Sequence, residues 1–140
     1  MLTRSVPKLT YEGARAILEA AAKKAKEMNL PICIAVVDDG GHLLAFARID
    51  DAKPSSAQVA VIKATSAALR RAATGPLPSA ENADVLLSLG MPLASGGKLT
   101  CVRGGLPIVW EATVVGGVGI SAGTQEQDEE VARAGLAALK

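Results

Sequence analysis

The uninterrupted apolar run Ile32–Val37 limits the possible folds more than any other segment of the sequence. Most of its residues are β-branched, which favours a strand over a helix. Because the run lacks the apolar–polar alternation of a strand with one solvated face, both of its faces must be covered. The chain therefore needs a sheet with other elements packed on each side.

Turn and capping signals predict the neighbouring elements. Thr10 is a candidate cap for a first helix, which ends at Asn29–Pro31, and Asp38–Gly41 has the composition of a hairpin turn. The later elements expected from the sequence are a return strand His42–Arg48, a helix from a cap at Ser55 or Ser56 to about Thr74, a short helix around Glu81–Leu89, a loop Gly90–Gly97, strands Leu106–Trp110 and Thr113–Ile120 joined at Glu111-Ala112, and a last helix from Thr124 to Leu139.

Hairpins, rather than single strands alternating with helices, predict an antiparallel sheet. We expect an α+β layered fold in which helices flank a sheet of about five strands. The chain has 140 residues, 49% of them hydrophobic and only 2% aromatic, which fits one domain spanning residues 1–140 with a core of small aliphatic side chains.

Charge and cysteine content exclude several classes of protein. A net charge of +1 without a basic stripe argues against nucleic-acid binding, and no apolar run is long enough to span a membrane. Cys33 and Cys101 are too few for a disulfide framework, and the N-terminal residues do not resemble a signal peptide. We therefore expect a reduced, cytoplasmic protein. One histidine and two distant cysteines predict no metal site.

Lys63 is the most informative candidate for chemistry. It is the only charged residue between Ser55 and Leu69, in a helix that is apolar nearly all round. A lysine in such a helix must extend to solvent, pair with a carboxylate or have a lowered pKa. Two interpretations remain open: a structural ion pair, or an amine that contacts an anionic group of a ligand.

Several acidic and basic residues are candidate partners for Lys63 or for a substrate. Asp38 and Asp50 lie at the ends of the two hairpin strands, where either carboxylate is available to pair with Lys63. Arg48 has the geometry to hold a substrate carboxylate, or else forms an edge ion pair with Asp50. Asp128 falls in the first turn of the last helix, where it complements the helix dipole or joins a site.

His42 and the glycine-rich stretches supply a second set of candidates. His42 is the only histidine and starts the return strand, so we expect it to be partly exposed. Glycines such as Gly105 and Gly119 mark a close approach of the backbone to a packed helix or to a ligand. Gly117–Ala122 fits a dinucleotide-binding pattern, but the helix after it ends the chain and no second parallel strand follows. We therefore reject a nicotinamide cofactor.

The start of the last helix is a further candidate binding position. Thr124 and Gln127 have the spacing of a capping box. The backbone N–H groups of such a helix start are free to receive an anion. Gln127 is therefore a candidate contact for an anionic group of a ligand.

Five segments, taken in order, resemble the GlcG/HbpS family over roughly Leu9 to Leu139. These segments are Ala35–Leu43, Ala47–Ala52, Lys63–Ala67, Gly104–Pro107 and Gly116–Ser121, followed by Gln127-Asp128. The resemblance implies a profilin-like fold with an antiparallel sheet and assembly into homo-oligomers, often octamers. It also implies possible haem as a ligand, since some members bind haem and a related domain forms the C-terminal part of PduO corrinoid adenosyltransferases.

The first functional hypothesis is an oligomeric binder of haem or a related tetrapyrrole, which the resemblance favours. The residues that match the family's recurring positions or its glycine motifs, and that we expect near such a ligand, are His42, Lys63, Gly105, Gly119 and Gln127. The scarcity of aromatic residues argues against it, because large side chains usually hold the flat face of haem.

The second hypothesis is a cofactor-free enzyme of the lyase, isomerase or hydrolase type that acts on a small carboxylated catabolite. In this hypothesis Lys63 and Asp38 transfer the proton, Arg48 holds the carboxylate and the last helix stabilises negative charge. The full set of candidate catalytic residues is Lys63, Asp38, Arg48, Asp50 and Asp128. A third possibility is a structural or chaperone-like subunit without a pocket.

Overall fold

The computed structural model describes residues 1–139, which fold around a four-stranded antiparallel sheet of strand order β2-β1-β4-β3. The elements in chain order are α1 (Tyr11–Glu27), β1 (Cys33–Asp38), β2 (Leu43–Arg48), α2 (Ser55–Arg70), α3 (Val85–Ala94), β3 (Gly105–Trp110), β4 (Thr113–Ser121) and α4 (Gln125–Leu136). The α+β class is confirmed. Within the described residues the sheet has four strands, slightly fewer than the five or so expected.

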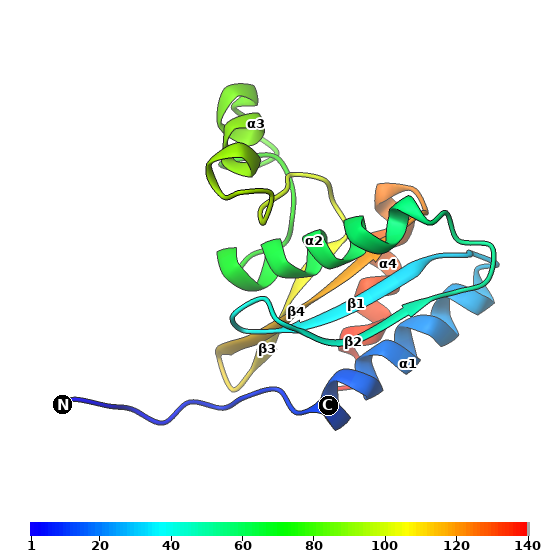
Figure 1. Cartoon of the computed structure of the whole chain (residues 1–140), viewed down its shortest axis with the longest axis horizontal. Coiled ribbons are helices and arrows are strands. Elements are labelled where there is room, and N and C mark those ends of the chain that lie inside the picture. Colours follow the sequence, from blue (N-terminus) through cyan, green and yellow to red (C-terminus); the bar gives the residue numbers. More distant parts are fainter. Residues whose placement is uncertain (140) are drawn as a thin grey trace.

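Helices cover both faces of the sheet, as the apolar run predicted. Figure 1 shows α2 on one face and α1 with α4 on the other. Successive residues of β1 point to opposite faces of the sheet. Ile34 and Val36 pack toward α1 and α4. Cys33, Ala35 and Val37 pack toward α2. All of these side chains are fully buried.

Two glycines of β4 let α2 lie directly against the sheet. A Cβ atom built on Gly119 would fall 2.1 Å from the carbonyl oxygen of Ala60, and one on Gly117 would fall 2.1 Å from that of Ala64. These distances leave no space for any side chain. The close approach marked by Gly119 is therefore made by a helix and not by a ligand.

Helices α2 and α4 differ from the sequence prediction at their boundaries. Helix α4 ends at Leu136 and not at Leu139. Helix α2 ends at Arg70 because Arg71 takes the left-handed conformation, with φ 58°, and its N–H donates to Ala67. At its other end α2 has Pro54 at the cap position, without a side-chain hydrogen bond from Ser55 or Ser56 to the backbone.

Helix α3 lies later in the chain than predicted, and the segment Gly90–Ala94 is helical instead of a loop. Asp84 is the actual cap, since its side chain accepts a hydrogen bond from the N–H of Leu87. A single glycine costs a helix only about 1 kcal/mol, so Gly90 does not end it. The chain leaves the helix just before Gly96 and Gly97, which have φ of 67° and 83°.

Helix α3 also stands apart from the layered body, beyond α2 (Figure 1). Of the helices that residues 1–139 form, none combines the length and the apolar character needed to cross a membrane.

The packing of α2 on β4 can be tested with two Gly→Ala substitutions. We expect Gly119→Ala to lower the free energy of unfolding by about 1–3 kcal/mol or more, because the new methyl group meets backbone atoms that cannot move independently. Gly90→Ala is the matched control: nothing lies within 4 Å of its Cβ position, and alanine favours a helix by up to about 1 kcal/mol. Urea unfolding measures both; equal stability of the two variants would contradict the packing.

Candidate functional site

The side chain of Lys63 is buried and bonded to two oxygen atoms. Its Nζ donates to Oδ2 of Asp128 at 2.9 Å and to the carbonyl oxygen of Ile120 at 2.8 Å. The side chains of Lys63 and Asp128 are each only 2% exposed. The pair joins α2 to α4, which lie on opposite faces of the sheet. Of the two interpretations of Lys63, the structural ion pair is the one observed.

Backbone atoms close the space around this ion pair. Asp128 Oδ1 accepts a hydrogen bond from the N–H of Gly123 at 3.0 Å. Gly104 has φ 126°, and a Cβ there would lie 2.8 Å from Nζ of Lys63. Burial raises the pKa of Asp128, while the hydrogen bond and charge of Lys63 and the Gly123 amide act in the opposite direction. The pair is thus an internal connection without room for a substrate.

Arg103 ties the loop next to the ion pair onto α4. Its backbone N–H donates to Oε1 of Gln125 at 3.0 Å. Its guanidinium forms ion pairs with Glu126 and Glu129, and these contacts raise the pKa of Arg103 above its ordinary value. The loop that carries Gly104 is therefore fixed over Lys63 at the surface as well as inside.

Asp38 and His42 form a different arrangement in the β1–β2 turn. Asp38 Oδ1 accepts hydrogen bonds at 2.9 Å from the backbone N–H groups of Gly40 and His42, and it lies 3.2 Å from Nδ1 of the His42 ring. Partial burial alone would raise the pKa of Asp38, but these hydrogen bonds and the charge of the ring hold it below its ordinary value. The carboxylate is thus held ionised beside the imidazole.

The ring of His42 is available to a ligand. Its side chain is 81% exposed. The neutral tautomer that donates its Nδ1 proton to Asp38 has its free lone pair on Nε2, and this is the arrangement typical of metal-ligating histidines. Among the ionisable side chains singled out in the sequence, His42 is the one that is both exposed and oriented by a hydrogen bond.

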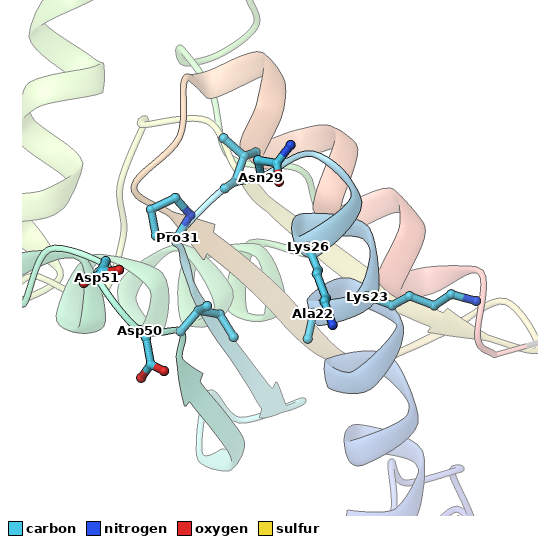
Figure 2. A pocket seen from close by; sticks show the side chains of 9 residues that line it. Ala22, Lys23, Lys26, Asn29, Pro31, Asp50 and Asp51 are labelled. Atoms are coloured by element: carbon cyan, nitrogen blue, oxygen red, sulfur yellow. The ribbon is translucent and has the colours of Figure 1, made fainter.

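Arg48 and Asp50 are exposed at the open end of the β1–β2 hairpin, away from this turn. Neither takes part in any of the six ion pairs that residues 1–139 form. Asp50 lines a groove of about 690 Å³ between the end of α1 and the β2–α2 loop (Figure 2). The expected edge ion pair between Arg48 and Asp50 is therefore not formed.

The candidates for an enzymatic site do not converge. Asp38 lies at one end of β1, whereas Arg48 pairs with Cys33 at the other end, roughly 16 Å away along the strand. Lys63 is bonded to Asp128 and to neither of the two carboxylates proposed for it, Asp38 and Asp50. The groove of Figure 2 is lined by Asp50 alone among the candidate catalytic residues.

Most of the candidate ligand-binding residues besides His42 make internal contacts. A Cβ on Gly105 would lie 2.3 Å from the carbonyl oxygen of Lys63, so helix α2 fills the space beside it. Gln127 completes the predicted capping box, which is confirmed: its Oε1 accepts the N–H of Thr124 at 3.0 Å. Nowhere in the described part of the chain do three His, Cys, Asp or Glu side chains gather as a metal-binding group.

Comparison with known proteins identifies the family. The family model described as "Haem degrading protein HbpS-like" matches residues 9–137. The chain belongs to the HbpS-like family. Protein GlcG of Escherichia coli strain K12 is 39% identical over 113 residues, which are 81% of each chain.

Solved structures of other proteins agree with this HbpS-like assignment. Klebsiella pneumoniae protein ORFY superposes with a TM-score of 0.89 and 31% identity, and the match covers 99% of this chain and 94% of ORFY. The structure titled as a complex of PduOC with heme superposes with a TM-score of 0.83 and 28% identity, over 94% of this chain and 95% of that one.

The coupling of Lys63 and Asp128 can be measured with a double-mutant cycle. We expect Asp128→Asn to cost about 3–5 kcal/mol, because it leaves a buried ammonium without its counter-charge. Adding Lys63→Met to this variant should recover more than half of the loss, since no unpaired charge then stays inside. Urea unfolding measures each variant, and losses that simply add would contradict the pair.

The lowered pKa of Asp38 predicts a pH-dependent contribution to stability. The ordinary pKa is 3.8, so the folded state is stabilised by the carboxylate above that pH and loses this stabilisation as the pH falls through the lower folded value. Asp38→Asn should therefore be less stable than the wild type at pH 7, with a smaller difference at pH 3. A difference in free energy of unfolding between Asp38→Asn and the wild type that stays constant from pH 7 to pH 3 would argue against the hydrogen bonds to Asp38. Asp39→Asn serves as the control and should not show the same change with pH.

Proposed function

We propose that this HbpS-like protein binds haem or a related tetrapyrrole as a homo-oligomer, and that Nε2 of His42 would hold the iron. The observation that carries the proposal is the exposed imidazole whose Nδ1 is oriented by Asp38. A carboxylate in this position fixes the ring and raises the basicity of the free nitrogen. Bound haem would supply one-electron and oxygen chemistry.

The surroundings of His42 fit an amphipathic, anionic ligand. Leu43 and Leu69 are exposed apolar side chains, and Leu69 lies beside the Gly41 turn, 3.7 Å from the Cβ position of that glycine. Arg71 donates to the carbonyl oxygen of Asp39 at 3.2 Å, which keeps a guanidinium next to the turn. Leucines are suited to contact the macrocycle, and a guanidinium is suited to a propionate.

Self-association belongs to the same proposal. The exposed leucines near His42 cover one side of a flat ligand at most, so a second copy would shield the other side from water. The resemblance to the GlcG/HbpS family implies an assembly of up to eight copies. Lys63, Gly105, Gly119 and Gln127 are not included in the proposed site, because their internal contacts occupy them.

Haem titration followed at the Soret band tests the proposal. We expect His42→Ala to weaken haem binding at least tenfold and to change the Soret maximum, because the iron loses its protein ligand. Asp38→Asn should weaken binding about 10–100-fold, as is typical when the partner of a ligating histidine is removed.

The control for this titration is Asp39→Asn. Asp39 is the neighbouring carboxylate, and its side chain pairs with Lys8 and not with the ring, so its removal should leave haem binding unchanged. Wild-type affinity and spectrum in His42→Ala would show that His42 is not the ligand.

A further inference from the structure

Helix α3 exposes an apolar surface that nothing in the described chain covers. Residues Val85–Ala94 include no charged side chain, and Leu86 and Leu93 are 83% and 85% exposed. Ser88 is the one buried residue of the helix. It fastens α3 to the preceding loop by hydrogen bonds with both the N–H and the carbonyl oxygen of Leu77.

The spacing of the exposed leucines is that of a helix–helix contact. Leu86, Leu89 and Leu93 are separated by three and four positions, so they follow one side of α3. Together with Val85, which lies on the same side, they expose roughly 500 Å² of surface, within the range of the largest apolar patch on a typical monomer. An uncovered patch of this size is typical of an interface.

The chain carries a second uncharged surface on the N-terminal half of α2, on the side that faces away from the sheet, whereas exposed Arg70 occupies the C-terminal end of that side. Val59 is exposed there and Ile62 is partly exposed. The one charged residue of this stretch, Lys63, points inward to Asp128. Val59 and Ile62, three positions apart, lie on one side of the helix. Ser66, one turn further on that side, is covered by the segment at Thr100, to which it is hydrogen-bonded.

We infer that the leucine stripe of α3 in one copy packs against this outer surface of α2 in a second copy, and that the second copy makes the reciprocal contact. A twofold arrangement of this kind uses the same pair of surfaces twice. Burial of the α3 patches of both copies removes roughly 1,000 Å², and with the α2 surfaces that they cover the contact reaches the size of a stable interface. The inference rests on the self-association proposed above and names its surfaces.

Charge supports a second copy over other occupants. A helix that binds an anionic membrane surface needs lysine or arginine along its polar side, and α3 has neither. A partner with charged groups at this contact would leave them buried without a counter-charge. A copy of the same chain offers the uncharged apolar positions Val59 and Ile62 on α2.

Sedimentation velocity over a range of protein concentrations tests this contact. We expect the variant Leu86→Lys/Leu93→Lys to dissociate at concentrations at least tenfold higher than those at which the wild type does. Val59→Glu should have a similar effect from the other surface. The matched control is Leu2→Lys/Val6→Lys, which adds the same charge to exposed apolar residues of the N-terminal segment and should associate like the wild type.

A mixing experiment identifies the two surfaces as partners. Chains carrying Leu89→Lys and chains carrying Val59→Glu should each associate weakly alone and form a mixed complex when combined, because the introduced lysine meets the introduced glutamate at one contact. Failure of the mixture to associate, with circular dichroism showing both variants folded, would overturn the pairing of α3 with α2.

The remaining outcomes separate this inference from the proposed function. A wild type that is monomeric at every concentration overturns both the self-association and the contact. A wild type that associates, with α3 variants that associate equally well, overturns the α3 contact alone. Binding of the wild type to vesicles of anionic phospholipid, lost in the uncharged variant Leu86→Gln/Leu93→Gln, would identify a membrane as the occupant and overturn the second copy.

Discussion

The backbone-to-backbone packing of α2 on β4 determines the positions of most other parts of the structure. Gly117 and Gly119 bring the helix so near to the strand that its small residues fill the layer. At this distance the long side chain of Lys63 cannot lie flat between helix and sheet. It extends to Ile120 at the end of β4 and to Asp128 in α4, and the loop with Gly104 closes over it. The short distance between α2 and β4 thus determines the positions of α2, of the buried Lys63 side chain and of the loop with Gly104.

Local signals in the sequence were sufficient for most of the fold. The apolar run Ile32–Val37 predicted a strand covered on both faces, and the caps at Thr10 and Thr124 are confirmed. Helix α3 was placed too early because Gly90 resembles a helix end, whereas capping by Asp84 decides where the helix starts. Local sequence patterns predict turns and caps well. Where two patterns suggest different helix boundaries, they do not show which one the chain uses.

The candidate site was harder to predict, because its contacts join distant segments. The pairing of Lys63 with Asp128 spans 65 positions in the chain, and an acidic residue in the first turn of a helix has a sufficient local explanation in the dipole. The contact between Asp38 and His42 spans only four positions, within one turn, yet the sequence does not reveal which ring nitrogen it leaves free. The structure thus separates a buried charged pair that stabilises from an exposed imidazole that is available for chemistry.

The sheet order has a consequence for how the protein is made. β1 lies between β2 and β4, and β4 emerges from the ribosome only after α2, α3 and β3. Until then, one edge of β1 has no partner and the small-residue face of α2 has no glycine strand to rest on. Non-local pairing of this kind slows folding and leaves apolar surface uncovered. The nascent chain therefore depends on its last third to complete the core. A ribosome that stalls before β4 would hold a chain with an unpaired strand edge and exposed apolar surface, which is prone to aggregate.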